Sequence, residues 1–241
     1  MLSIVIPAYN EENRLKRCLK PTISYLKNEP FESEIIAVLD GCTDNTRAVA
    51  ESFQCEFTNL KIVDYSPNRG KGYAVKTGML EAKGDMRMFM DADYAVPIET
   101  LPEYIEKLKN GYDIVIASRR HKDTVIEEHQ LFFRELAGKG FGLLQRIILG
   151  IPYYDTQCGF KLFTEEAAKY LFPQLKYNCS YFDAEMMYIA YKGKMKVMEM
   201  PVKWKHDGVT SMPIGSSRTI DLLKKLIRLK GNHKNIPEWK S

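Results

Sequence analysis

The sequence predicts an α/β fold whose sheet is mostly parallel and covered by helices on both faces. Short, almost wholly apolar runs alternate with longer segments in which apolar residues recur at helical spacing. Strands that form continuous apolar runs are typical of parallel sheets buried on both faces. A chain of 241 residues is long enough for one such domain with a full core.

The first half of the chain alternates strands and helices without interruption. The first strand is expected over residues 2–6, where Pro7 ends it, and the first helix over residues 12–27. Thr43 is placed to cap the second helix. The remaining elements of this half are strands at 34–39, 60–65, 86–90 and 112–117 and helices at 44–54, 73–82 and 98–109. This alternation predicts a Rossmann-like half.

The second half is less regular. Residues 121–129 are polar and predict a loop, and Thr164 is placed to cap a helix. Because no linker, repeat or low-complexity tract interrupts the chain, we expect one domain over residues 1–215, followed by a basic amphipathic helix and tail over residues 216–241. The further elements expected are helices at 131–149, 182–191 and 218–230 and strands at 160–163 and 195–204.

The composition excludes several classes of protein. A formal net charge of +4 is too small to indicate nucleic-acid binding, but it is compatible with an anionic substrate or a membrane surface. The five cysteines are scattered and odd in number, which predicts reduced thiols in a cytoplasmic compartment. No signal peptide precedes the first strand, and no uncharged apolar run approaches the ~20 residues that span a bilayer. We therefore expect no membrane-spanning segment.

Acidic residues lie at the ends of two predicted strands. Asp91 and Asp93 directly follow the strand at 86–90, and Asp40 follows the strand at 34–39. In an open α/β sheet, ligands bind beyond the carboxyl ends of the strands. Two carboxylates spaced i, i+2 can bind Mg²⁺ or Mn²⁺ together with substrate phosphates, so the pattern favours a nucleotide site. The sequence contains neither Gly-x-Gly-x-x-Gly nor a P-loop motif, which disfavours dinucleotide oxidoreduction and P-loop chemistry.

Seven short motifs follow one another along the chain. The first four are Val5-Ile-Pro-Ala-Tyr-Asn-Glu11, Asp40-Gly-Cys-Thr-Asp44, Asn68-Arg-Gly-Lys-Gly72 and Asp91-Ala-Asp93. In this order and spacing they resemble the inverting family-2 glycosyltransferases of GT-A fold. The last three are Ser118-Arg119, Asp155-Thr-Gln-Cys-Gly-Phe-Lys161 and Phe182-Asp-Ala-Glu185. These are similar to motifs of the polyprenyl-phosphate sugar transferases, and most of all to the branch that transfers glucose to dolichyl phosphate.

The resemblance covers about residues 2–210 and implies roles on the donor side of the reaction. Asp91 and Asp93 would hold the metal and the diphosphate of a nucleotide sugar, and Lys71 would help to bind phosphate. Ala95 stands where mannosyl-type relatives carry a glutamine, which fits the glucosyl branch and leaves the metal with fewer protein ligands. The nucleoside would be held by Pro7, Tyr9, Glu11 and Asp40.

On the acceptor side, the resemblance implies that Arg119 and Arg134 bind the phosphate of the lipid, which suits the charged fork of arginine. Asp183 is expected to position sugar hydroxyls or these arginines, because a phosphate acceptor is already an anion and needs no general base. Asp183 and Glu185 do not face one another on a helix, so they are not an acid–base pair. His206 could contact the diphosphate, and an ordinary loop histidine is equally compatible. The expected catalytic residues are Asp93, Asp183, Arg119 and Arg134.

These features predict a metal-dependent enzyme that moves a hexose, expected to be glucose, from a UDP-sugar to dolichyl or another polyprenyl phosphate. One alternative is a glycosyltransferase that acts on a glycan hydroxyl with Asp183 as general base. Another is a non-catalytic nucleotide-sugar-binding membrane adaptor. The basic helix near the C-terminus predicts peripheral contact with the cytoplasmic face of a membrane, unless it packs on the domain and exposes its basic face to solvent.

Overall fold

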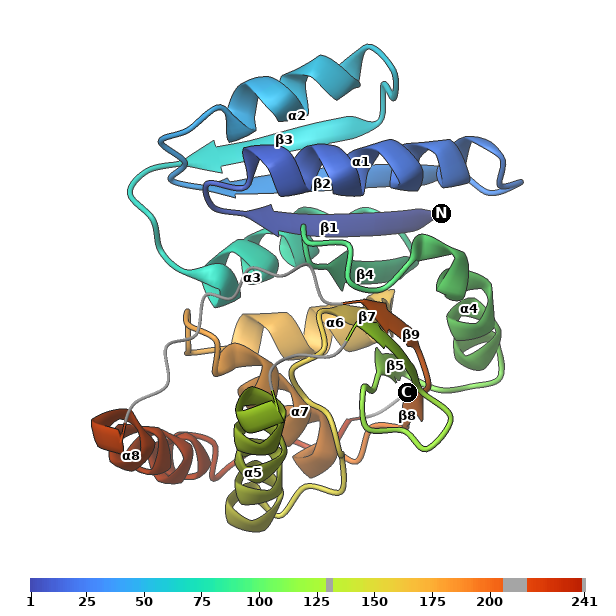
Figure 1. The fold of residues 1–241 in the computed structure, drawn as a ribbon. Helices are drawn as coiled ribbons and strands as arrows, with labels where there is room; N and C mark the ends of the chain where they lie inside the picture. The colour runs from blue at the N-terminus through green and yellow to red at the C-terminus, as the bar shows by residue number, and fades with distance from the viewer. Residues whose placement is uncertain (129–131, 206–215, 240–241) are drawn as a thin grey trace.

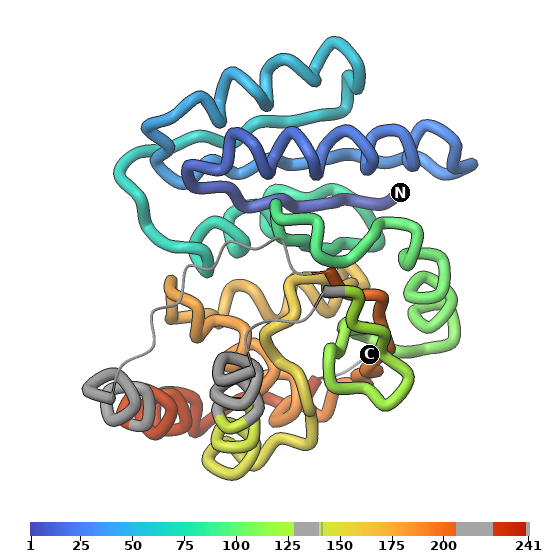
Figure 2. The backbone as a smooth tube through the Cα atoms, viewed as in Figure 1, coloured from blue at the N-terminus to red at the C-terminus, as the bar shows by residue number. Residues whose placement is uncertain are grey.

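The computed structural model of the chain contains a seven-stranded sheet in the order β3-β2-β1-β4-β7-β5-β8, with helices on both faces (Figure 1). This arrangement confirms the predicted α/β class. The structure describes residues 1–128, 132–205 and 216–239; for residues 128, 132–139, 141 and 216–223 it describes the backbone alone (Figure 2). Within these ranges, no helix is both long and apolar enough to cross a membrane.

The elements of the main sheet and its helices follow the predicted order closely. The strands are β1 (Leu2–Ala8), β2 (Ser33–Asp40), β3 (Leu60–Tyr65), β4 (Met86–Met90), β5 (Ile114–Ala117), β7 (Phe160–Thr164) and β8 (Val197–Met200). The α-helices are α1 (Glu12–Lys27), α2 (Thr46–Gln54), α3 (Lys71–Glu81), α4 (Leu101–Lys109), α5 (Phe132–Leu149), α6 (Glu165–Leu171), α7 (Phe182–Lys192) and α8 (Ser216–Asn232). Two 3₁₀ turns, η1 (Ile98–Thr100) and η2 (Phe172–Gln174), precede α4 and follow α6.

The direction of the strands decides which loops meet. β3, β2, β1 and β4 are parallel, so their carboxyl ends lie at one edge of the sheet. β7 runs antiparallel between β4 and β5 and pairs Phe160 with Met90. The loop that precedes β7 therefore arrives at the same edge as the acidic residues that follow β4. A site at this edge can draw on residues from both halves of the chain.

Two predictions for the second half were wrong. The expected loop at 121–129 contains a strand, β6 (Val125–Glu128), and the expected single strand at 195–204 is divided into β8 and β9 (Lys203–Lys205). Pro201 follows β8 directly and has no N–H to continue the ladder. β9 pairs instead with β6 in a separate two-stranded sheet.

The two predicted helix caps had different outcomes. Thr164 caps α6 as expected, because its Oγ1 accepts a hydrogen bond from the backbone N–H of Ala167 at 3.1 Å. The expected cap at Thr43 was wrong, since α2 begins only at Thr46. The side chain of Asp44 accepts from the backbone N–H of Thr46 at 3.0 Å. The following helix thus starts two residues later than predicted.

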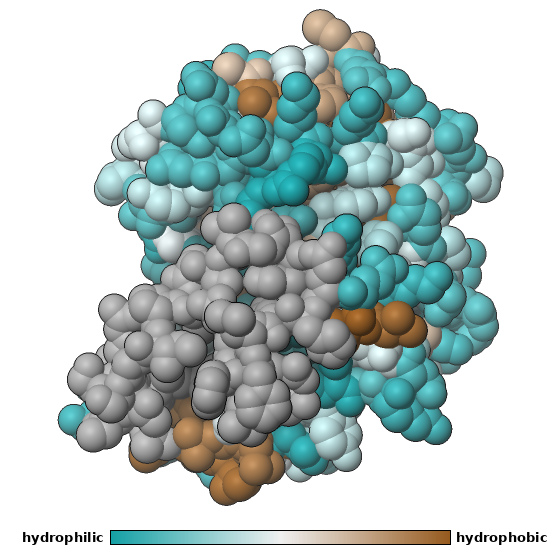
Figure 3. Space-filling model, viewed as in Figure 1, coloured by the Kyte–Doolittle hydropathy of each residue, from teal (hydrophilic) through white to brown (hydrophobic). Residues whose placement is uncertain are grey.

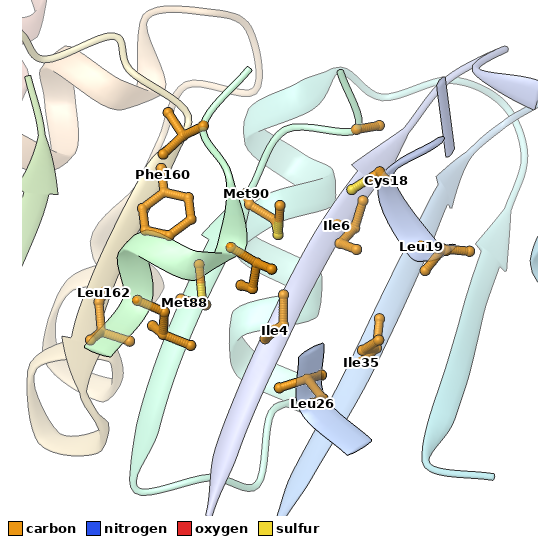
Figure 4. Close-up of a cluster of buried hydrophobic side chains, with 14 of the residues drawn as sticks. Ile4, Ile6, Cys18, Leu19, Leu26, Ile35, Met88, Met90, Phe160 and Leu162 are labelled. Atoms are coloured by element: carbon orange, nitrogen blue, oxygen red, sulfur yellow. The ribbon is translucent and has the colours of Figure 1, made fainter. Parts of the chain in front are cut away.

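Each face of the sheet carries its own apolar core. Successive strand residues point to opposite faces, so Ile4 and Ile6 pack with α1, α2 and α4, whereas Val5 packs with α3, α6 and α7. Figure 4 shows part of the first core, in which side chains of β1, β2, β4 and β7 meet Cys18 and Leu19 of α1. Burying each such side chain contributes about 1.5–3 kcal/mol. These cores hold the strand ends in place.

The C-terminal helix packs on the domain over the half whose side chains are described. Leu226 and Leu229 are fully buried, and α8 lies beside α5 (Figure 1). After the helix, the ring of Trp239 lies edge-on to the ring of Tyr170, with 5.2 Å between centroids. The backbone N–H of Trp239 also donates to the carbonyl of Gly193 at 2.9 Å. The tail is therefore fastened to the protein beyond the end of α8.

Candidate active site

The loops after β1 and β2 are joined by side-chain to backbone hydrogen bonds. Asn10 accepts from the backbone N–H of Thr43 at 2.8 Å, and the N–H of Glu11 donates to the hydroxyl of Thr46 at 2.8 Å. Pro7 is buried in β1, whereas half of the Tyr9 side chain is exposed (50%) at the strand end. The carboxylate of Glu11 pairs with Arg14. Of the predicted nucleoside residues, Tyr9 presents the most open surface to a ligand.

Asp40 is buried at the end of β2 and holds the start of α3. Its two carboxylate oxygens accept hydrogen bonds from the backbone N–H groups of Arg69 and Gly70, at 2.7 and 2.8 Å. Gly70 has a φ of +98°, which an L side chain rarely adopts. In this structure the Asp40 carboxylate thus orders the turn before Lys71, a contact that the sequence did not indicate.

Asp91 lies at the end of β4 and contacts two other segments. Its backbone N–H donates to the carbonyl of Gly159 at 2.9 Å, and a Cβ at residue 159 would collide with the Asp91 carboxylate, so only glycine fits there. Lys71 Nζ lies 2.6 Å from Asp91 Oδ1. Burial by itself would lower the pKa of Lys71, but the carboxylates of Asp91 and Asp183 outweigh it and raise that pKa. Lys71 is therefore a firmly charged cation beside Asp91.

Asp93 follows two residues later and extends the acidic cluster. Its Oδ1 accepts from the backbone N–H of Ala95 at 3.0 Å, which fixes the turn after β4. Burial raises the pKa of Cys18, and the negative charges of Asp93 and Asp91 raise it further. Within the described ranges, no group of three or more His, Cys, Asp or Glu side chains could hold a metal ion by itself. The two aspartates fit a metal that takes its other oxygen ligands from a diphosphate.

Arg119 follows β5 and is held by a fork of hydrogen bonds. Its Nε and Nη2 donate to the two oxygens of Asp155 at 2.7 and 2.9 Å. Burial alone would raise the pKa of Asp155, but the Arg119 guanidinium outweighs it and holds that pKa well below its usual range. Glu199 accepts from the backbone N–H of Asp155 at 3.0 Å, which anchors the loop in turn. Arg119 is therefore rigidly placed: burial alone would lower its pKa, but Asp155 outweighs this and raises it, and the nearby charge of Asp91 raises it further.

Asp183 forms a buried ion pair with Lys161. The Nζ of Lys161 donates to Oδ1 of Asp183 at 2.7 Å and to the carbonyl of Cys158 at 2.6 Å. Lys161 is fully buried, and Asp183 is 3% exposed. Burial raises the pKa of Asp183, while the charges of Lys161 and Lys71 oppose this rise. The carboxylate is thus engaged inside the protein.

The structure gathers most of the predicted site residues at one edge of the sheet. Lys71 lies within electrostatic reach of Asp91, Asp93 and Asp183, and Arg119 lies within reach of Asp91. The side chain of Arg134, in the first turn of α5, and the whole of His206 lie outside the described residues.

Sequence reasoning did not assign individual roles to Asp155, Gly159 and Lys161. The signal was available as the Asp155–Lys161 motif, but the partners of these three residues lie 36, 68 and 22 residues away in the chain, at Arg119, Asp91 and Asp183. Asp155 holds Arg119, Gly159 leaves room for the Asp91 carboxylate, and Lys161 neutralises Asp183.

Comparison with known proteins identifies the family of the chain that carries this site. Residues 3–172 match the family model described as glycosyl transferase family 2. A dolichyl-phosphate beta-glucosyltransferase of Trichomonas vaginalis is 36% identical over 234 residues, which cover 92% of this chain and 69% of that protein. The protein of the same name from Homo sapiens is 35% identical, over 84% of this chain and 67% of its own length.

A solved structure shares the fold. Glucosyl-3-phosphoglycerate synthase from Mycobacterium tuberculosis, in complex with Mn²⁺, UDP and glucosyl-3-phosphoglycerate, superposes with a TM-score of 0.67 at 18% identity, covering 99% of this chain and 81% of that one. This likeness supports the GT-A fold. With the family match over most of its length, the chain belongs to glycosyl transferase family 2, where it is a glycosyltransferase related to the dolichyl-phosphate beta-glucosyltransferases.

Proposed function

We propose that this enzyme transfers glucose from UDP-glucose to a polyprenyl phosphate such as dolichyl phosphate, with inversion at the anomeric carbon. The names of its relatives support this reaction. The observation that carries the proposal is the placement of Arg119, whose guanidinium is fixed by Asp155 within electrostatic reach of Asp91. A cation held at this place suits an anionic acceptor that must approach an anionic donor.

On the donor side, each residue has a separate task. The exposed ring of Tyr9 offers a surface for the base, next to Pro7 and Glu11. Asp40 holds the turn that carries Lys71, through the backbone N–H groups of Arg69 and Gly70. The Lys71 ammonium, 2.6 Å from Asp91, is placed to contact the diphosphate. Lys71 would then stabilise the charge that develops on the leaving group.

We further propose that Asp91 and Asp93 hold Mg²⁺ or Mn²⁺ together with the diphosphate. Two carboxylates with oxygen ligands from phosphate suit these hard cations. The bound metal would supply a Lewis acid that neutralises charge on the departing diphosphate. The structural relative from Mycobacterium tuberculosis binds Mn²⁺ and UDP, which supports a divalent metal as the cofactor.

On the acceptor side, the phosphate oxygen attacks the anomeric carbon from the face opposite the diphosphate. Arg119 and Arg134 would bind this phosphate, and the two hydrogen bonds to Asp155 would hold the Arg119 guanidinium in position. A phosphate monoester carries its own negative charge, so the attack needs no proton acceptor. This agrees with the burial of Asp183 against Lys161, which leaves that carboxylate poorly suited to serve as a general base.

We also propose that the protein works at the cytoplasmic face of a membrane, to which it attaches peripherally. Leu143 and Ile147 of α5 are 55% and 69% exposed, one helical turn apart, and Ile227 of α8 is 63% exposed. Figure 3 shows an apolar patch at the lower edge of the view, where Figure 1 draws the end of α5. Lys224 and Arg228 are exposed near Ile227. Apolar side chains flanked by cations suit an anionic lipid surface.

Transfer of radiolabelled glucose into a solvent-extractable lipid tests the reaction. UDP-glucose is supplied with dolichyl phosphate in one reaction and with a soluble glycan in another, each with Mg²⁺. The proposal expects label in the lipid phase only when dolichyl phosphate is present. Label in the glycan instead would favour the hydroxyl-acceptor alternative, and UDP-glucose binding without any transfer would favour the non-catalytic adaptor.

Vesicle sedimentation tests the membrane surface. Leu143→Glu/Ile147→Glu should weaken binding to vesicles that contain anionic lipid, and higher salt should weaken binding of the unchanged protein. The matched control is Leu80→Glu on α3, which alters an exposed leucine (46%) of another element. Equal binding by the α5 variant and the control would rule out this face as the membrane contact.

A further inference from the structure

The tail after α8 reaches the interior of the protein at His233. This side chain is 5% exposed, and its Nε2 lies 2.6 Å from Oε1 of Glu185, which is fully buried on α7. Two further bonds hold the same stretch: Lys176 Nζ donates to the carbonyl of Asn232 at 2.7 Å, and Asn232 Nδ2 donates to the hydroxyl of Tyr177 at 3.2 Å. The end of α8 is thus joined to the loop before α7 as well as to α7 itself.

Glu185 uses both of its oxygens to hold that loop. Oε1 accepts from the backbone N–H of Lys176 at 2.9 Å, and Oε2 accepts from the N–H of Tyr177 at 3.0 Å. Two successive amides on one carboxylate fix both the position and the orientation of the loop. Because His233 contacts the same carboxylate, it orients the group on which the loop depends.

The loop in turn contacts the first turn of α3. The carbonyl of Asn178 accepts from the backbone N–H of Gly72 at 2.8 Å, and a Cβ at residue 70 would collide with the same carbonyl. Asp40 holds the N–H groups of Arg69 and Gly70. Lys71 therefore lies in a stretch that is held by Asp40 and by Asn178. From this stretch the Lys71 side chain extends to Asp91, where its Nζ lies 2.6 Å from Oδ1.

We propose that His233 is a positioning residue for donor binding: through Glu185 and the 176–178 loop it fixes the backbone that aims Lys71 at the donor diphosphate. The proposal rests on the proposed function, in which Lys71 and Asp91 form the diphosphate site. It assigns to the C-terminal tail a task in the active site, although His233 itself touches no substrate.

A double-mutant cycle on UDP affinity tests this role. Binding of UDP with Mg²⁺ is measured by calorimetry for the full chain, for His233→Ala, for Lys71→Ala and for the double variant. Lys71→Ala should weaken binding roughly 10- to 150-fold, the loss of one charge-assisted bond. His233→Ala should weaken it about three- to tenfold in the presence of Lys71, and the double variant should bind no more weakly than Lys71→Ala alone.

Two further variants separate positioning from simple loss of stability. Tyr170→Phe removes the bond from the Tyr170 hydroxyl to the carbonyl of Pro237, which fastens the same tail elsewhere, and should leave UDP affinity unchanged. His233→Gln keeps an amide donor close to the place of the ring Nε2 and should restore part of the affinity. If His233→Ala does not fold, the cycle is run with Asn232→Ala, which should weaken UDP binding about twofold, again only when Lys71 is present.

Unchanged UDP affinity in the folded His233 or Asn232 variant, or a loss that persists in the Lys71→Ala background, overturns the proposal. Failure of the unsubstituted protein to bind UDP would instead contradict the proposed function, so the two failures are distinguishable.

Discussion

Replacing Lys161 with Met removes the counter-ion of a buried carboxylate. Lys161 is fully buried in β7, and Asp183, at 3% exposure, would lose the ammonium group that lies 2.7 Å from its Oδ1. Removing one partner of a buried ion pair costs about 3–5 kcal/mol. For a chain of 241 residues, at about 2–4 °C per kcal/mol, the melting temperature should fall by about 6–20 °C. Thermal unfolding followed by circular dichroism measures this change.

Removing the carboxylate charge as well should reverse most of the loss. In Lys161→Met/Asp183→Asn no charge is stranded, so the double variant should lie within about 2 kcal/mol of the unsubstituted protein. Two results would refute the assignment of a buried ion pair. One is a double variant whose loss of unfolding free energy equals the sum of the losses in the two single variants. The other is a loss below about 1 kcal/mol for Lys161→Met.

The same pair predicts how Asp183 affects turnover. Asp183→Asn keeps an oxygen that can accept from Lys161, so transfer to dolichyl phosphate should fall by no more than about tenfold. Loss of a required general base typically costs ~10²–10⁴-fold. A folded Asp183→Asn protein with no measurable turnover would contradict the phosphate-acceptor mechanism and support the glycan alternative.

Three further predictions concern the metal, the acceptor and pH. Excess EDTA should abolish transfer and Mg²⁺ or Mn²⁺ should restore it, and Asp93→Ala should lower turnover at least ~100-fold without unfolding the protein; full activity in EDTA would exclude the metal. Arg134→Ala should raise the apparent KM for polyprenyl phosphate roughly 10- to 150-fold while donor affinity stays nearly unchanged, and equal changes in both would contradict the acceptor role. Because Arg119 holds the pKa of Asp155 well below its ordinary value of about 3.9, that carboxylate stabilises the fold above about pH 5 and loses its contribution as the pH falls toward its lowered pKa. Urea unfolding at several pH values should therefore show a flatter acid limb for Asp155→Asn, and an unchanged acid limb would refute the ion pair as its cause.

The main sheet could be predicted from the sequence because several of its strands are nearly continuous apolar runs. β1 and β4 satisfy this rule, and each is followed by residues that the fold brings to the same edge. β6 and the separation of β9 from β8 could not be predicted, because Val125–Glu128 and Lys203–Lys205 carry charged residues instead of a continuous apolar run and are stabilised by pairing with each other. The start of α2 was misplaced because Thr43, Asp44 and Asn45 are all good capping residues, and only the folded loop places the N-cap position at Asn45.

Site residues could be proposed from the sequence where polar side chains directly follow a predicted strand. Asp91 and Asp93 could be singled out from their place after β4, and in the structure Lys71 lies beside Asp91 and within electrostatic reach of Asp93. The partners of Arg119 and Asp183 could not be identified, because a lysine in an apolar strand or an aspartate in a loop has many possible neighbours. The antiparallel insertion of β7 determines these pairs by bringing the 155–159 loop to the acidic edge.

The linkage formed in the product distinguishes transfer to phosphate from transfer to a glycan hydroxyl. The enzyme is incubated with UDP-glucose and a short polyprenyl phosphate, and the purified product is examined by mass spectrometry and by ¹H and ³¹P NMR. We expect one hexose joined to the lipid through a phosphodiester, with coupling between the anomeric proton and phosphorus and the β configuration that inversion of an α-linked donor requires. An α-linked product, or glucose joined to a glycan hydroxyl in place of phosphate, would contradict this expectation.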